Sequence, residues 1–201
     1  ASGVAFGLGV LVSIGSAAVG ASTKVVDTLR TALRLPTPAV VAAPIPAGAE
    51  LGLPGLTSLV TPNTDFFRID TALVVPQIDP ATWSLRIHGL VENEVTITWD
   101  ELLALPREEY WVTLACGSNP IGGDLIGNAK WLGYPIRELL ARAKPTAEAD
   151  MVLSRSIDGF TASSPLEALT DTGRDAILAV GMNGEPLPAQ HGFPVRMVVP
   201  G

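Results

Sequence analysis

Apolar and polar residues alternate through much of the middle of the chain, which predicts short β-strands. Residues 83–90 alternate, Glu92-Asn93-Glu94 turns the chain, and residues 95–99 alternate again, so this part is predicted to be a hairpin. Further apolar, β-branched or aromatic runs predict strands over residues 110–115, 151–157, 175–182 and 195–199. The pair Asn183-Gly184 predicts a tight hairpin turn.

Short helices are predicted between these strands. Thr98 or Asp100 can cap a helix that Pro106 ends. Residues 136–143 have the periodicity of an amphipathic helix, and residues 165–169 form one helical turn.

Several glycines lie between the strand predicted over residues 110–115 and the helix predicted over residues 136–143. Gly122, Gly123 and Gly127 predict a loop there. No internal repeat is visible, and strands outnumber the short helices without alternating regularly with them. The fold class predicted from this pattern is therefore strand-rich α+β.

The N-terminal 23 residues carry no charge and are rich in apolar residues, Gly and Ala. About 20 such residues can cross a bilayer as a helix, so residues 1–23 are predicted to be a transmembrane segment, with a buried or disordered helix as the alternative. A signal peptide is disfavoured because no Met or basic residue opens the chain, and we expect the first residue to be the edge of a fragment. Lys24, Arg30 and Arg34 follow, and the positive-inside rule would place that end in the cytoplasm.

A proline-rich stretch separates this segment from the rest. A short helix is predicted around residues 23–35, and residues 36–62 contain six prolines with several Gly and Ala, which predicts an extended tether. The predicted organisation is a membrane segment over 1–23, a helix and linker over 24–60, and a globular domain over 61–201.

The net charge of the chain bears on whether it binds nucleic acid. The net charge is −7, and no run of Lys or Arg is present. Nucleic acid is therefore excluded as an expected partner, because phosphate binding needs a basic face.

Cys116 is the only cysteine, and it follows the predicted strand over residues 110–115. A single thiol cannot form an internal disulfide, so it serves either packing or chemistry. The Gly-Ser-Asn turn after it can direct backbone amides at the sulfur, which favours the reactive thiolate. From these residues alone both alternatives stay open.

Four polar stretches stand out, over residues 61–68, 112–119, 154–159 and 181–196. In this order they resemble the molybdopterin-binding domain of the sulfite oxidase family, in particular its bacterial membrane-tethered members. The most specific piece is the run Gly-Met-Asn-Gly followed by His-Gly-Phe-Pro-Val-Arg. The resemblance covers about residues 61–201 and includes Asn128-Ala129-Lys130-Trp131.

The resemblance implies a molybdenum–molybdopterin cofactor, in which a pterin dithiolene holds the metal and the protein adds one thiolate ligand. Cys116 matches that ligand, and a soft thiolate suits such an ion. The implied activity is two-electron oxo transfer, either oxidation of sulfite-like anions or reduction of S- or N-oxides.

The resemblance also assigns the other site residues. His191 and Arg196 match positions that contact the pterin and its phosphate, and Arg68 matches the arginine that binds an oxyanion substrate in sulfite-oxidising relatives. The remaining matched positions near the cofactor are Asn63, Phe67 and Ser156. Arg155 and Lys130 are second candidates for binding phosphate or substrate charge.

The implied partners are a small oxyanion or oxide substrate, an electron-transfer partner and the membrane. Tethered relatives are mostly extracytoplasmic, so we expect that location despite the basic residues after the N-terminal segment. Gly117 and Pro120 differ from the bulkier residues often found after the ligand, and the sequence stops just before the region that completes the pocket in the family. Two alternatives remain, a thiol enzyme in which His191 activates Cys116, and a membrane-tethered, β-rich binding module without activity.

Overall fold

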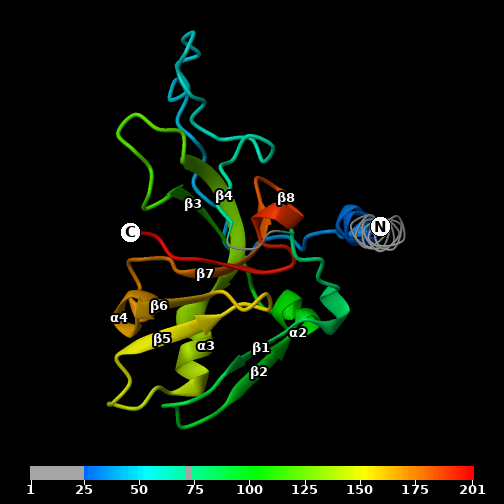
Figure 1. Cartoon of the computed structure of the whole chain (residues 1–201), viewed down its shortest axis with the longest axis vertical. Coiled ribbons are helices and arrows are strands. Elements are labelled where there is room, and N and C mark those ends of the chain that lie inside the picture. Colours follow the sequence, from blue (N-terminus) through cyan, green and yellow to red (C-terminus); the bar gives the residue numbers. More distant parts are fainter. Residues whose placement is uncertain (1–24, 71–73) are drawn as a thin grey trace, which may run out of the picture.

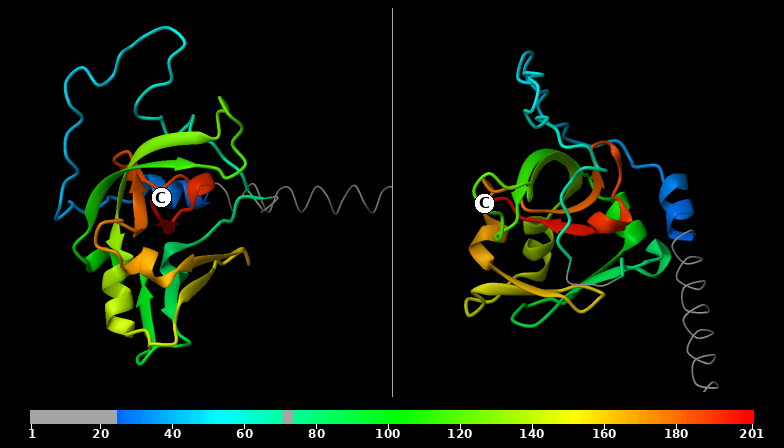
Figure 2. Two further views of the ribbon diagram at one scale, coloured as in Figure 1. Left: turned by 90° about the vertical axis from the view of Figure 1, so that its left-hand side faces the viewer. Right: turned by 45° about the horizontal axis from the view of Figure 1, so that its top comes forward.

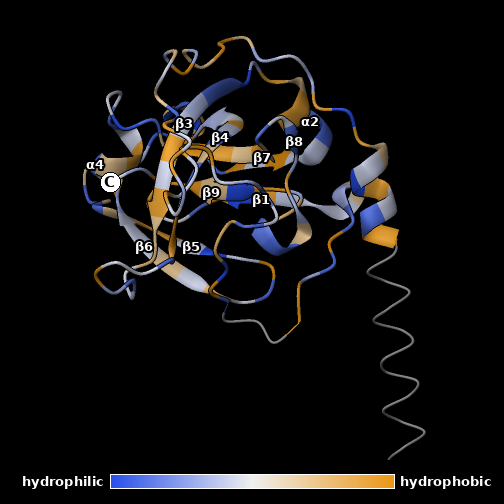
Figure 3. Ribbon diagram, turned by 90° about the horizontal axis from the view of Figure 1, so that it is seen from above, coloured by the Kyte–Doolittle hydropathy of each residue, from blue (hydrophilic) through white to orange (hydrophobic). Residues whose placement is uncertain are grey.

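A curved antiparallel sheet lies at the centre of the molecule, in a computed structural model that describes residues 25–70 and 74–201 (Figure 1). Among these residues its strands are β3 (Glu108–Ala115), β4 (Ile126–Pro135), β7 (Ile177–Met182), β8 (Glu185–Pro186) and β9 (Arg196–Val198). The order is β3-β4-β7-β8, and β9 pairs with the first half of β7. Because β7 is buried along its whole length, it forms the hydrophobic middle of the sheet (Figure 3).

Two separate hairpins lie together at one end of the molecule (Figures 1 and 2). One pairs β1 (Ser84–Ile87) with β2 (Val95–Thr98) and confirms the predicted hairpin. The other pairs β5 (Met151–Arg155) with β6 (Thr161–Pro165). The strand β5 was predicted, but β6 was not, because Thr-Ala-Ser-Ser-Pro has small polar residues in place of a hydrophobic alternation.

The helices are short; the three α-helices between β2 and β7 lie close to their predicted positions, whereas the two 3-10 turns were not predicted. In chain order the helices are η1 (Pro80–Thr82), α2 (Trp99–Ala104), α3 (Ile136–Ala143), α4 (Leu166–Thr170) and η2 (Ala189–His191). At the start of α2, Thr98 accepts a hydrogen bond from the Glu101 amide while the Glu101 carboxylate accepts one from the Thr98 amide. This capping box satisfies amides that the first turn leaves without a partner.

Hydrophobic clusters cover both faces of the sheet. Leu178 and Val180 of β7 belong to a cluster that includes α2, α3 and α4, whereas Ile177 and Ala179 belong to a second cluster with Trp131. Successive residues of a strand point to opposite faces, so the two clusters lie on opposite sides. The second cluster supports the segments that carry most of the predicted site.

The strand β4 corrects the prediction of a loop that includes Gly127. Gly127 lies inside β4, opposite Leu114 of β3. A Cβ at this position would lie 2.6 Å from the Phe66 ring, so the strand needs glycine where the ring covers it. Gly122 and Gly123 do lie in the connection between β3 and β4, as predicted.

The predicted transmembrane segment, residues 1–23, lies outside the described residues. Within residues 25–70 and 74–201, no helix has both the length and the apolar composition needed to cross a bilayer. Residues 25–32 are helical, in agreement with the predicted helix, and Val26 is buried in the second hydrophobic cluster.

The proline-rich segment after this helix, residues 36–62, is extended and forms a long loop at the top of Figure 1. Part of it is fastened to the edge of β3, a contact that the sequence did not predict. The Ala39 amide donates to the Arg107 carbonyl (2.7 Å), the Glu109 amide donates to the Val40 carbonyl (2.9 Å), and the Trp111 indole donates to the Ala43 carbonyl (2.9 Å). These bonds cover an edge of β3 that would otherwise be unpaired.

Candidate functional site

Cys116 is the first residue after β3, and its partly exposed side chain lies at the beginning of a tight turn. Its amide donates to the Leu125 carbonyl (2.9 Å), and its carbonyl accepts from the Asn119 amide (2.9 Å). The sulfur lies 3.0 Å from the Ser118 hydroxyl. Hydrogen bonds from the Ser118 hydroxyl and then from the Ser118 amide lower the pKa of the thiol, which favours the thiolate.

Residues 61–63 are held along β4 by a polar network. The Thr61 amide donates to the Asn128 carbonyl (2.8 Å), and the Thr61 hydroxyl accepts from the Asn128 amide (3.1 Å). The Asn183 side chain donates to the Thr61 carbonyl and to Asn63 Oδ1, both at 2.9 Å, and accepts from the Lys130 amide at 2.9 Å. Asn183 was predicted only as a turn residue, but it also joins the 61–63 segment to the sheet.

Phe66 connects this segment to both the cysteine strand and the C-terminal run. Its ring packs over Gly127, which pairs with Leu114 two positions before Cys116. The same ring makes edge contacts with Trp131 (5.8 Å between centroids) and with His191 (5.5 Å), and Phe67 stacks on it at 5.2 Å. Phe67 is thus linked to His191 through the Phe66 ring.

His191 is buried, with 3% of its surface exposed. Its Nε2 lies 3.1 Å from the Asn63 carbonyl oxygen, which can only accept, so Nε2 carries the proton and donates it. Burial lowers the pKa of His191 from its ordinary value, against the opposing effect of the hydrogen bond to Asn63. The ring is therefore neutral near pH 7, with Nδ1 as an acceptor.

The depressed pKa of His191 predicts a loss of stability in mild acid. An unfolded chain protonates this histidine below about pH 6.5, whereas the folded chain takes up the proton only at lower pH. The free energy of unfolding is then fully maintained above about pH 6.5 and falls as the pH drops toward the folded pKa. We expect urea unfolding of the full-length protein to show a shallower fall from about pH 7.5 to about pH 5.5 in His191→Gln than in the wild type.

His88 provides the matched control, because it is the other histidine of the chain and is exposed after β1. The variant His88→Gln is expected to keep the wild-type pH dependence. Equal pH dependence in the wild type and His191→Gln would contradict the assignment of a neutral, buried His191.

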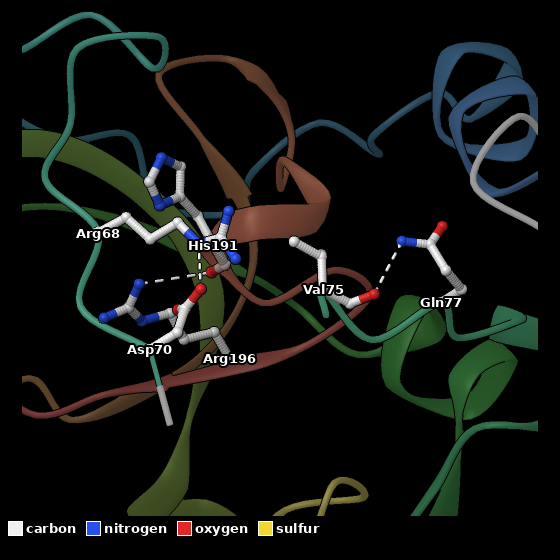
Figure 4. Close-up of polar contacts among 6 residues, drawn as sticks. All are labelled: Arg68, Asp70, Val75, Gln77, His191 and Arg196. Atoms are coloured by element: carbon white, nitrogen blue, oxygen red, sulfur yellow. Dashed lines mark hydrogen bonds and ion pairs between the residues drawn. The ribbon is translucent and has the colours of Figure 1, made fainter. Parts of the chain in front are cut away.

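Arg68, Asp70, His191 and Arg196 come together beside η2, as Figure 4 shows. Arg196 donates to the His191 carbonyl (3.4 Å), and its guanidinium lies 5.5 Å from the centre of the Trp131 ring. Arg68 forms an ion pair with Asp70. Burial lowers the pKa of Arg196, which stays cationic because arginine is protonated at any ordinary pH.

Ser156 lies across an adjoining cleft of about 620 Å³. The cleft is lined by residues 69–70 and 75–78, the β5–β6 turn and the residues around Phe193, so Ser156 and Arg155 share it with Asp70. Ser156 donates a hydrogen bond to Asp158. Lys130, the other second candidate, forms an ion pair with Glu109 (2.9 Å) on the neighbouring strand.

The predicted site residues therefore form one group and two outlying positions. Asn63, Phe67, Arg68, His191 and Arg196 gather around Phe66 and Trp131, either directly or through one neighbour. Ser156 faces the adjoining cleft, and Cys116 stands at the end of β3, with hydrogen bonds to its own turn. Sequence reasoning missed two members of this group: Phe66, which lies inside the polar 61–68 stretch, and Asp70, which lies two residues beyond it.

The side chains present fit a molybdenum–molybdopterin. Cys116 offers a thiol biased toward the thiolate, which is the form that binds a soft metal. Arg196 is a partly buried cation whose direct contacts are a carbonyl and an aromatic ring, so it can still take a phosphate oxygen. His191 offers a neutral ring for a heteroatom donor, and the adjoining cleft provides space.

Comparison with known proteins gives consistent results. Residues 72–201 match the family model described as the oxidoreductase molybdopterin binding domain. The chain is 34% identical over 165 residues to mitochondrial sulfite oxidase of Homo sapiens, covering 71% of this chain and 30% of that protein. It is 30% identical over 184 residues to NADH nitrate reductase 1 of Arabidopsis thaliana, covering 78% of this chain and 20% of that protein.

A solved structure shares the fold. The crystal structure of the sulfane dehydrogenase SoxCD from Paracoccus pantotrophus superposes with a TM-score of 0.65 and 28% sequence identity, covering 73% of this chain and 41% of that chain. The chain spans 30% of the length of the human sulfite oxidase that it matches.

Proposed function

Because this chain belongs to the oxidoreductase molybdopterin-binding domain family, and its cofactor is therefore molybdenum–molybdopterin, we propose that Cys116 is the protein ligand of the metal. The observation that carries this proposal is the thiol at the end of β3, whose pKa is lowered by the hydroxyl and amide of Ser118. A thiolate that is already favoured before metal binding needs less free energy to lose its proton.

The proposed activity is two-electron oxo transfer, which is the chemistry that the bound cofactor supplies. Oxidation of a sulfite-like anion takes one oxygen atom from water and releases two protons and two electrons. Reduction of an S- or N-oxide consumes two protons and two electrons and releases water. In either direction the electrons pass to or from a separate electron-transfer partner.

The other residues bind and orient the cofactor and substrate in this proposal. His191, fixed as the Nε2–H form by the Asn63 carbonyl, presents Nδ1 as a hydrogen-bond acceptor. Arg196, supported by the Trp131 ring, holds a phosphate oxygen of the pterin, and Arg68, in the same group of side chains (Figure 4), takes part in binding the substrate. Phe66 and Phe67 exclude water from one side of the group.

The alternative of a Cys–His thiol enzyme has no support from the contacts. The Cys116 sulfur hydrogen bonds with Ser118, and among the described residues no hydrogen bond joins it to His191, whose Nε2–H donates to the Asn63 carbonyl. A base that activates a thiol must lie within hydrogen-bond reach of it.

An assay of the full-length protein in both directions tests the proposal. Protein from molybdate-grown cells is expected to oxidise sulfite with an acceptor dye or to reduce dimethyl sulfoxide or trimethylamine N-oxide with a reduced dye. Protein from tungstate-grown cells, otherwise identical, is the control and is expected to be inactive. Equal activity in the two preparations, or inactivity of a fully metal-loaded protein in both directions, would contradict the proposal.

A further inference from the structure

Asp70 places a carboxylate among the basic side chains of the site (Figure 4). It forms an ion pair with Arg68, and both residues are exposed, with 32% of the Asp70 side chain and 40% of the Arg68 side chain accessible to solvent. Burial lowers the pKa values of His191 and Arg196, and the charge of Asp70 opposes this effect at both residues. One carboxylate therefore acts on all three basic groups.

This position has a consequence for anion binding at Arg68. A guanidinium binds a carboxylate and an oxyanion through the same N–H donors, so the two compete. An oxyanion that approaches Arg68 must either displace Asp70 or bind beside its negative charge. Both routes weaken the binding of anions, and neither affects an uncharged ligand to the same degree.

The cleft that Asp70 lines is also unfavourable for small anions. Its charged lining residues are Asp70, Arg155 and Asp158, so negative charge exceeds positive charge. Most of the remaining lining is apolar and includes Trp83 and Phe193. Such a surface favours a neutral molecule with an apolar part over a small anion.

We propose that Asp70 sets the charge selectivity of this site, so that it accepts an uncharged S- or N-oxide in preference to a sulfite-like anion. The proposal rests on the proposed function and names its substrate class. Asp70 is a positioning and selectivity residue, because it acts through Arg68 and not on the reacting atoms.

Binding of inorganic sulfate, which resembles the anion but is not turned over, tests the proposal without any need for activity. Calorimetric titration of the full-length, cofactor-loaded protein at low ionic strength is expected to show about tenfold tighter sulfate binding in Asp70→Asn than in the wild type. The gain should shrink as salt is added, because the repulsion is screened. Asn keeps the shape of the side chain and a hydrogen-bonding oxygen, so the local fold is retained.

Two further variants show whether the effect acts through Arg68. Asp65 is an exposed residue of the same segment, and its carboxylate accepts a hydrogen bond from the Thr64 hydroxyl. Asp65→Asn removes one negative charge, as Asp70→Asn does, and is expected to leave sulfate binding unchanged. In an Arg68→Gln background, Asp70→Asn is expected to give no gain in sulfate affinity. A double-mutant cycle of these two substitutions measures this dependence. The proposal is overturned if Asp70→Asn binds sulfate no more tightly than the wild type, or if Asp65→Asn gives the same gain.

Kinetics give a second readout. The KM for sulfite is expected to fall by about tenfold in Asp70→Asn, whereas the KM for dimethyl sulfoxide stays at its wild-type value. Equal changes in both KM values would overturn the selectivity role. Absence of molybdenum from the wild-type protein would instead contradict the proposed function, and sulfate titration of the metal-free wild type and Asp70→Asn would still decide the role of Asp70.

Discussion

Cys116→Ser is expected to lower the affinity of the full-length protein for molybdenum by more than about 100-fold and to abolish oxo transfer. Changes to groups that merely support a ligand cost about 10- to 100-fold, so loss of the ligand itself should cost more. A serine hydroxyl is a hard ligand that keeps its proton at neutral pH, whereas the Cys116 thiol is already biased toward the thiolate. Molybdenum per protein, determined by mass spectrometry of the metal, measures the effect.

Ser118→Ala is the matched control for this prediction. It keeps the sulfur and removes the hydroxyl that lies 3.0 Å from it. We expect about a 10-fold loss of metal affinity, because the thiolate loses one hydrogen bond but remains a ligand. If Cys116→Ser retained as much molybdenum as Ser118→Ala, the assignment of Cys116 as ligand would be wrong.

Trp131→Ala is expected to lower the free energy of unfolding by about 3–5 kcal/mol. Trp131 is 0% exposed and is the largest fully buried side chain among the described residues. Its indole donates to the Val112 carbonyl (3.2 Å), so the substitution leaves both a cavity and an acceptor without its partner. A loss of this size is a large part of the total stability of an ordinary domain.

The same substitution should also weaken cofactor retention, because Trp131 supports both Phe66 and Arg196. Trp111→Ala is the matched control: Trp111 lies on β3, is partly exposed and donates to the Ala43 carbonyl of the extended segment. It is expected to cost less stability and to leave the molybdenum content unchanged. Denaturant unfolding and metal analysis of both variants measure the two effects, and equal losses in both variants would contradict the role given to Trp131.

Local sequence patterns predicted the elements that have one buried face, and they also predicted β7, whose continuous apolar run is typical of a strand buried on both faces. The β1–β2 hairpin alternates in the sequence because only one of its faces is covered, and α2 was found from its cap and the proline that follows it. The strand β4 was not found, because residues 131–135 are all buried and include a glycine and a proline. Burial on both faces removes the alternation by which a strand is identified.

The sequence likewise identified some residues of the candidate site and missed others. The sequence identified His191, Arg196 and Arg68 through the family resemblance, and the structure groups them. It did not identify Asp70, because an ion pair between residues two apart in an irregular segment depends on how the chain bends. Nor did it predict the bonds of Asn183 to Thr61 and Asn63, which join residues about 120 positions apart in the sequence.

X-ray absorption at the molybdenum edge tests the central claim most directly, since it counts the sulfur atoms bound to the metal. The measurement compares the full-length wild type with Cys116→Ser loaded with excess cofactor. The wild-type spectrum is expected to require one sulfur ligand more than that of the variant. The same sulfur count in both proteins would contradict the claim that Cys116 binds the metal.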